Sequence, residues 1–175
     1  HTIGRRQRQM CIRDSIIASQ NQNKLVEFKK ILGDKINLFS LSDIGLNQEI
    51  PENEKTIKKN AMFKAKFVNI QTGKNVFADD TGLEIDSLNG EPGAYSARYS
   101  GVERNSDKNI ELVLRKLKNK ANRNSRFKTI ISLIIDGKSV NFEGVVEGKI
   151  TEEKRGSNGF GLSLIHISEP TRHAS

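Results

Sequence analysis

The sequence predicts an α/β fold in which a mixed β-sheet is flanked by helices. Short apolar runs typical of buried strands alternate with segments whose apolar residues recur every three or four positions. The later part of the chain contains three consecutive extended segments, with the hairpin signal Asp136-Gly137 between the first two. A chain of 175 residues has room for one such domain with a real hydrophobic core.

Each predicted element of the first half depends on a local pattern. A short apolar run or alternation predicts a strand, and a spacing of three and four predicts a helix. In chain order, we expect a strand at 15–19, a helix at 23–32, a strand at 36–41, a loop at 42–54 and a helix from 57 to about 71. Thr56 is the predicted N-cap of the second helix, and Gly73 ends it.

The second half is predicted in the same way. A strand at 76–78 ends at Asp79-Asp80-Thr81-Gly82, and a further strand follows through Leu83 and Ile85. Ser106 or Asp107 is expected to cap a helix that runs to about residue 119. The last predicted elements are a loop at 89–105 and antiparallel strands at 126–135, 139–145 and 148–151.

The two ends of the chain are interpreted as adapter-derived sequence. Residues 10–14 can be written as the codons ATGTGTATAAGAGAC, and residues 162–167 as CTGTCTCTTATACACATC. These belong to two DNA strings that are reverse complements of each other and resemble the transposase mosaic end used in sequencing libraries. We therefore assign residues 16–161 to the domain, and residues 1–15 and 162–175 to adapter sequence outside it.

The composition of residues 16–161 narrows the possible chemistry. The single Cys and all three His lie outside this range, so Cys or His nucleophiles and a Cys/His zinc site are excluded. The net charge is +8 for the whole chain and +5 for this range, which raises a basic, non-enzymatic nucleic-acid-binding module as an alternative. The basic residues are, however, spread among acids, without a Lys/Arg block interleaved with aromatics.

Two stretches at predicted strand ends carry groups suited to a phosphate and a metal. Residues 19–24 link a buried strand to a helix, where backbone N–H groups and Lys24 could cradle a phosphate; an ordinary capped loop is the alternative. Asp79 and Asp80 carry carboxylates suited to Mg²⁺, and a simple turn is the alternative. Because neighbouring side chains of a strand point to opposite faces, we do not expect both carboxylates to face one site.

Three further stretches could contribute. Glu52 precedes the long helix, on which Asn60 and Lys64 share one face; Lys64 would suit a polyphosphate, and the alternative is a solvated lysine. Residues 92–99 contain two Tyr and Arg98, which could hold a base or a phosphate or could pack between lobes. Phe160, in a glycine-rich loop, could lie against a ring or simply pack within the loop.

Together these stretches resemble one family, the inosine triphosphate pyrophosphatases, also called XTP/dITP diphosphatases. The family's T/S-G-N-x-x-K opening is similar to residues 19–24, with Gln20 in place of glycine. Its metal-site Glu and T-F-x-x-N-A-x-x-K-A helix resemble Glu52 and residues 56–65, with Glu54 for a glycine and Ile57 for phenylalanine. The other family motifs are A-D-D-S-G-L, P-G-x-Y-S-A-R-Y and G-x-N-G-F-G, which resemble residues 78–83, 92–99 and 156–161.

The resemblance implies an elongated mixed sheet with flanking helices, two lobes around a central cleft, and a cytoplasmic homodimer. It implies Mg²⁺-dependent hydrolysis of ITP, dITP or XTP to the monophosphate and pyrophosphate, without nucleic-acid or membrane partners. In this scheme Asp80 activates water, and Glu52, Asp79 and Asp80 hold the metal. The implied substrate-binding residues are Ser19, Gln20, Asn21, Gln22, Asn23, Lys24, Lys64, Thr81, Arg98, Phe160 and Gly161. A Maf-type pyrophosphatase is a nearer alternative, but its Arg-rich opening does not occur here.

The resemblance also implies a C-terminal truncation. The family pattern continues with Y-D-P, a lysine and an S-H-R segment, which do not occur here, and His166 is not equated with that histidine. We therefore expect the chain as given to be inactive and poorly stable, with apolar surface uncovered around Ile131, Leu133 and Ile135. At about 25 cal/mol per Å² of apolar area, a few hundred Å² would cost several kcal/mol, comparable with the stability of a small domain.

This expectation can be tested by comparing residues 16–161 alone with a restored chain, in which a family-type C-terminal segment follows Gly161. We expect the restored chain to melt at a higher temperature and to hydrolyse ITP, because the segment covers apolar surface and contributes base-binding residues. Calorimetry and pyrophosphate release provide the measurements. Equal melting temperatures and equal hydrolysis by the two chains would show that the segment has no such role.

Overall fold

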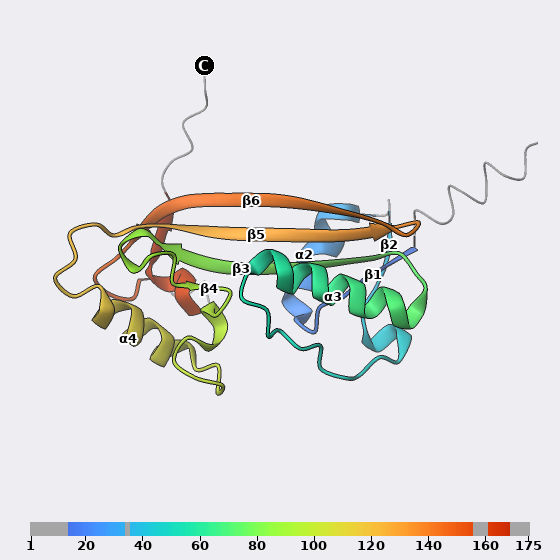
Figure 1. The fold of residues 1–175 in the computed structure, drawn as a ribbon, viewed down its shortest axis with the longest axis horizontal. Coiled ribbons are helices and arrows are strands. Elements are labelled where there is room, and N and C mark those ends of the chain that lie inside the picture. Colours follow the sequence, from blue (N-terminus) through green and yellow to red (C-terminus); the bar gives the residue numbers. More distant parts are fainter. Residues whose placement is uncertain (1–13, 34–35, 156–160, 169–175) are drawn as a thin grey trace, which may run out of the picture. The chain divides into compact units, whose positions relative to one another are not determined.

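The computed structural model describes residues 14–33, 36–155 and 161–168, and it confirms the predicted α/β class (Figure 1). The helices of this part of the chain are α2 (Gln22–Leu32), α3 (Ile57–Thr72) and α4 (Ser106–Lys116). The strands are β1 (Asp14–Ile17), β2 (Asn37–Phe39), β3 (Val76–Ile85), β4 (Pro92–Gly93), β5 (Asn124–Ile135), β6 (Lys138–Ile150) and β7 (His166–Ser168). Short 3₁₀ turns occupy Ser42–Ile44, Asp86–Leu88, Ser96–Arg98 and Gly161–Ile165. None of the helices in the described residues has the length and hydrophobicity that a bilayer crossing requires.

The strands form a mixed sheet with the hydrogen-bonded order β2-β1-β3-β5-β6-β7, and β4 pairs with β3. β1 is parallel to both β2 and β3, whereas the β3–β4 and β6–β7 pairs are antiparallel. The turn between β5 and β6 consists of Asp136 and Gly137, with φ of 48° and 74°. Two successive residues with positive φ are typical of a type I′ hairpin, so the predicted hairpin is confirmed.

The chain divides into two compact units. Unit 1 comprises residues 1–80 and 130–142, and unit 2 comprises residues 81–129 and 143–175. In unit 1, helices α2 and α3 cover opposite faces of the strands, because successive residues of β1 and β3 alternate between two apolar clusters. The α3 cluster includes Ile16, Ala18, Ala65, Val68, Val76 and Ala78. The α2 cluster includes Ile17, Leu25, Leu38 and Phe77, with Phe28, Ile131 and Leu133 against them.

The expected loss of cover around Ile131, Leu133 and Ile135 is therefore wrong in its location. All three side chains are partly buried, and α2 covers the face of β5 on which Ile131 and Leu133 lie. The large exposed apolar side chains of the neighbouring hairpin strand lie on β6 instead, at Val140, Phe142, Val145 and Val146.

Unit 2 has a separate core beneath α4. Its buried cluster contains Leu83, Ile85, Ile110, Val113, Leu117, Ile150, Leu162 and Ile165. Leu162 and Ile165 belong to the C-terminal segment that we assigned to adapter sequence, and in the structure they are 5% and 0% exposed. Residues of β7 pair with Gly148–Ile150 at the end of β6. The segment therefore supplies apolar cover and a short strand to this unit.

Several predicted boundaries are wrong. β3 runs without a break from Val76 to Ile85, although we predicted an end at Asp79–Gly82. The strand continues because lysine side chains neutralise its two acids and because it pairs with β5 on one side. β6 is likewise a single strand across Gly144 and Gly148, since pairing with β5 outweighs the local preference of glycine for turns.

Helix α4 also differs from its prediction at both ends. Asn105 is the N-cap, since its side chain accepts a hydrogen bond from the backbone N–H of Lys108 at 3.0 Å. The helix ends at Lys116, and Asn119 has a φ of 67°, in the left-handed region that stops helical continuation. Asn and Ser are similarly good caps, so local preference alone did not separate the two positions.

The cap of α3 is confirmed and can be tested. The Thr56 hydroxyl accepts from the backbone N–H of Lys59 at 3.2 Å, and Gly73 ends the helix with a φ of 65°. Because Thr56→Ala removes this acceptor, we expect the free energy of unfolding to fall by about 1 kcal/mol. Urea denaturation provides the measurement. Thr56→Ser keeps the hydroxyl and should stay near the parent; an equal loss in both variants would contradict a capping role.

Candidate active site

The alternation of β3 determines the partners of its two acids. Asp79 follows Phe77 on the face that α2 covers, and Asp80 follows Ala78 on the face that α3 covers. The ammonium group of Lys24, on α2, donates to the Asp79 carboxylate, and Lys64, on α3, donates to Asp80. The two neighbouring carboxylates are therefore bound by lysines from two different helices, as the predicted opposite orientation requires.

Lys64 is the central cation of the α3 side. Its Nζ lies 2.9 Å from Oε1 of Glu52 and 3.5 Å from Oδ1 of Asp80. The residue is only 6% exposed, so our alternative of a solvated surface lysine is wrong. Lys64 is buried because it lies one helical turn from Asn60 on the face that packs against β3, where Ala61 and Ala65 leave room for it. The cluster thus joins a loop, a helix and a strand through one ammonium group.

Asn60 completes this cluster. It is 1% exposed, and its Oδ1 accepts from the backbone N–H of Glu54 at 3.0 Å. Burial raises the pKa of Asp80, and the nearby Asn60 side chain acts against that shift. The sequence indicated only that Asn60 shares a helix face with Lys64. Its function in the cluster was missed, although an amide on a helix face rich in alanine is a signal of a buried polar contact.

The pKa values in this cluster are shifted by burial and by the neighbouring charges. Burial raises the pKa of Asp80 above its usual 3.8; Lys64 opposes this shift, and Glu52 adds to it. Burial acts to lower the pKa of Lys64, but the carboxylates of Asp80 and Glu52 outweigh it and raise that pKa above 10.5. Lys64 therefore stays charged at neutral pH, and Asp80 is a stronger base than an exposed aspartate.

The predicted phosphate loop is an exposed strand-to-helix connection. The Ser19 hydroxyl accepts from the backbone N–H of Asn21 at 3.2 Å, and Asn21 Oδ1 accepts from the backbone N–H of Lys24 at 3.4 Å. The Gln20 amide donates to the carbonyl of Gln48 at 3.2 Å. Gln22 and Asn23 lie in the first turn of α2. The loop therefore places the start of α2 and Lys24 beside Asp79.

The implied Mg²⁺ ion would need carboxylate ligands in this part of the chain. The described residues contain no group of three or more His, Cys, Asp or Glu side chains arranged to hold a metal, since ammonium groups contact the three acids. Within the same part of the chain, however, Asp79 Oδ1 and Asp80 Oδ2 are buried without a hydrogen-bond partner. Two buried carboxylate oxygens that lack a donor suit a hard divalent cation in their chemistry.

The other predicted site residues that the structure describes lie in unit 2, where each has a different neighbour. The Thr81 and Thr129 hydroxyls are 2.9 Å apart, and the Arg98 guanidinium lies 5.1 Å from the centre of the Tyr95 ring. Gly161 begins a 3₁₀ turn with a φ of 54°, and a side chain there would lie 3.7 Å from the Ser106 hydroxyl. Phe160 lies outside the described residues.

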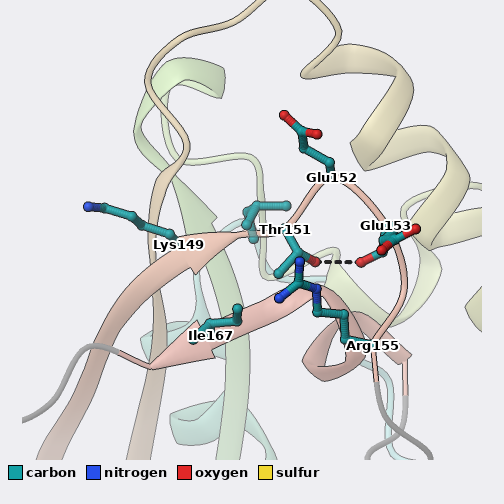
Figure 2. A pocket seen from close by; sticks show the side chains of 7 residues that line it. Lys149, Thr151, Glu152, Glu153, Arg155 and Ile167 are labelled. Atoms are coloured by element: carbon teal, nitrogen blue, oxygen red, sulfur yellow. Dashed lines mark hydrogen bonds between the residues drawn. The ribbon is translucent and has the colours of Figure 1, made fainter.

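Unit 2 also contains an open pocket of about 480 Å³ (Figure 2). Its lining residues are Lys149, Ile150, Thr151, Glu152, Glu153, Arg155 and Ile167. The Thr151 hydroxyl donates to the Glu153 carbonyl at 2.6 Å, which shapes the turn after β6. None of the predicted catalytic or metal-binding residues lines this pocket, so we do not place the chemistry there.

Known proteins are similar to this chain in sequence. Residues 15–173 match the Ham1 family. The chain is 48% identical over 154 residues to the dITP/XTP pyrophosphatase of Flavobacterium johnsoniae, covering 88% of this chain and 80% of the relative. It is 44% identical over 160 residues to that of Bacillus subtilis, covering 89% and 81%.

Solved structures are similar as well. The Ham1 protein of Staphylococcus aureus matches with a TM-score of 0.81 and 38% identity, over 87% of this chain and 80% of that protein. A HAM1 protein from Coxiella burnetii matches with a TM-score of 0.82 and 34% identity, over 87% and 80%. The predicted family resemblance and fold class are therefore confirmed.

The buried position of Lys64 leads to a prediction about stability. Lys64→Met keeps most of the side-chain volume but leaves Glu52 and Asp80 without their shared cation. Because Glu52 is partly exposed, we expect a loss of about 2 to 3 kcal/mol in the free energy of unfolding at pH 7, below the upper range for buried pairs. Lys66→Met, at an exposed position on the same helix, is the control. Its free energy of unfolding, measured by urea denaturation, should change by less than about 0.5 kcal/mol.

The pH dependence follows from the raised pKa values. While Glu52 and Asp80 are ionised, the stabilisation by Lys64 is fully present up to pH 10.5, and it is lost as the pH rises through the raised folded pKa of Lys64. In Lys64→Met, protonation of Asp80 removes the unpaired charge, so the deficit should shrink as the pH falls through the raised pKa of Asp80. A deficit that is equal at pH 7 and pH 4 would contradict this account.

Proposed function

The chain belongs to the Ham1 family, and from this membership we propose that it hydrolyses non-canonical purine nucleoside triphosphates. The substrates are ITP, dITP and XTP, and the products are the nucleoside monophosphate and pyrophosphate. The observation that carries the proposal is the buried Lys64–Asp80–Glu52 cluster in a chain 48% identical to a dITP/XTP pyrophosphatase. Neither a Maf-type enzyme nor a nucleic-acid-binding module is favoured by these relatives.

In this proposal Asp80 is the general base. A water oxygen forms a bond to the α-phosphorus, its proton passes to the Asp80 carboxylate, and the bond from the α-phosphorus to the bridging oxygen breaks to release pyrophosphate. The raised pKa of Asp80 supports this role, because a base is more effective when its pKa lies nearer the working pH. No histidine is needed for the step.

Lys24 and Lys64 provide the positive charge for the triphosphate. Lys24 lies in the first turn of α2, where the positive end of the helix dipole also favours an anion. Lys64 remains charged at neutral pH because two carboxylates hold it. The remaining substrate contacts are assigned to residues 19–23 and to Thr81, Arg98, Phe160 and Gly161, by the family resemblance.

Glu52, Asp79 and Asp80 would hold a Mg²⁺ ion. The two buried carboxylate oxygens of Asp79 and Asp80 that lack a donor in the described residues support this assignment. When bound, Mg²⁺ supplies neutralisation of phosphate charge and lowers the pKa of a coordinated water. The protein's own contribution is to keep three acids and two lysines within one electrostatic cluster.

The further family properties are part of the same proposal. The enzyme acts as a cytoplasmic homodimer, its family domain spans residues 16–161, and residues 1–15 and 162–175 derive from adapter sequence. Sequencing the genomic locus tests the last point, since it shows whether a Y-D-P motif follows Gly161. Light scattering of the restored chain tests the dimer.

The activity itself is tested by pyrophosphate release from ITP, dITP, XTP, ATP and GTP, with and without Mg²⁺. Both the 175-residue chain and the restored chain are assayed, the latter with the C-terminal segment of the Flavobacterium johnsoniae relative. We expect release from the non-canonical nucleotides by the restored chain. Release from none of the five would refute the proposal.

The assignment of Asp80 leads to a mutational prediction. Asp80→Asn keeps the shape but removes the base, so turnover of the restored chain should fall by about 10² or more. Steady-state release of pyrophosphate from ITP provides the measurement. Asp86→Asn, on the exposed turn after β3, is the matched control and should retain turnover. Near-parent turnover in Asp80→Asn would remove Asp80 from the mechanism.

A further inference from the structure

Asn109 is a buried polar side chain on α4 to which the proposed chemistry assigns no role. It is 3% exposed and lies one helical turn after the Asn105 cap. Burying an amide is costly unless its hydrogen bonds are made, so its partners indicate what it holds in place. Both polar atoms of the Asn109 amide have partners within residues 96–100, the turn that includes Arg98.

The hydrogen bonds of Asn109 determine the orientation of its amide. Its Oδ1 accepts from the backbone N–H and from the hydroxyl of Ser100, each at 2.7 Å. Its NH₂ group donates to the Ala97 carbonyl at 2.9 Å and, at a longer 3.4 Å, to the Ser96 carbonyl. Because a backbone N–H can only donate and a carbonyl can only accept, the opposite orientation of the amide would break the bonds on both sides.

These bonds hold the turn on both sides of Arg98. Ala97 precedes Arg98, Ser100 follows two residues after it, and the same amide binds both. The Ser96 hydroxyl makes a second attachment, since it accepts from the Leu83 backbone N–H on β3 at 2.8 Å. The turn is therefore attached both to a helix and to a strand of unit 2.

Helix α4 is a firm support for this turn. Ile110 and Val113, on the same helix, are 4% and 0% exposed in the core of unit 2. The Arg98 side chain, by contrast, is long and has many rotamers, and its guanidinium lies 5.1 Å from the centre of the Tyr95 ring. Fixing the backbone that carries a flexible cation leaves fewer conformations for a ligand to restrict, and so favours binding.

We propose that Asn109 is a positioning residue that fixes the 96–100 turn and thereby preorganises Arg98 to bind the nucleotide. The attachment of the turn is a property of this chain; its consequence for substrate binding rests on the proposed function, in which Arg98 contacts the substrate. An amide is suited to this task because it accepts from the N–H and hydroxyl groups on one side, donates to carbonyls on the other, and adds no charge to a buried position.

The attachment is tested by NMR hydrogen exchange on the 175-residue chain and on the restored chain. The backbone amide of Ile150, which donates to the Arg123 carbonyl away from the turn, is the reference. We expect Asn109→Ala to speed exchange of the Ser100 backbone amide at least tenfold relative to this reference. Asn105→Ala removes the cap of α4 but keeps the Asn109 amide, so it should change the ratio less than threefold. An equal ratio in the parent and in Asn109→Ala would overturn the attachment.

The consequence for substrate binding is tested in the restored chain with Asn109→Ala and Asn109→Ser, so that one variant remains if the other does not fold. We expect KM for ITP to rise at least tenfold and kcat to stay within threefold, because Asp80 and Lys64 are untouched. Asn105→Ala is the matched control: it weakens the start of α4 without releasing the turn, so its KM should stay within threefold.

A double substitution shows whether Asn109 acts through Arg98. If it does, Asn109→Ala should raise KM less than threefold when Arg98→Ala is already present, whereas independent effects would multiply. A tenfold rise in both backgrounds, or a cooperatively melting Asn109 variant with the parent's KM, would overturn the positioning role. A restored parent chain without turnover would refute the proposed function, and the exchange measurements would still decide whether Asn109 holds the turn.

Discussion

The candidate site depends on the alternation of side chains along β3. Because Asp79 and Asp80 are consecutive residues of one strand, they point to opposite faces, and each face of unit 1 is covered by a different helix. Lys24 from α2 therefore binds one acid and Lys64 from α3 binds the other. A turn at this position, which the residue types alone would allow, would remove this division of partners.

Charge balance is the second constraint on the site. Three carboxylates and two ammonium groups lie around the two faces of β3 in a partly buried region, where an unpaired charge would be costly. The cluster has one more acid than base, and two of its carboxylate oxygens lack a donor within the described residues. That small excess of negative charge fits a site that uses a cation with an anionic substrate. Burial raises the pKa of Asp80 although a lysine lies beside it, and Glu52 adds to this shift.

Helix α3 gives the cluster its rigidity. Its start is set by Thr56 and its end by Gly73, and the spacing of four residues places Asn60 and Lys64 above one another on the buried face. Ala61 and Ala65 on the same side bring the helix close to the strands. In consequence, the charged amine of Lys64 reaches both Asp80 on β3 and Glu52 in the loop, and the neutral amide of Asn60 accepts from Glu54 in the same loop.

Sequence by itself determined the α/β class, the cap and end of α3, the hairpin at Asp136-Gly137 and the family, and it supplied the residues proposed for the site. These features depend on local patterns or on motifs, which are present in the order of the residues. Only the tertiary structure decided that β3 continues through its two acids, that Lys64 is buried, and that the Asn60 amide accepts a hydrogen bond from the Glu54 backbone N–H. Each of these depends on a partner distant in the chain: pairing with β5 keeps β3 extended, and contacts between loop, helix and strand remove Lys64 and Asn60 from solvent. Burial and ion pairing depend on neighbours in space, and a local sequence pattern does not specify those neighbours.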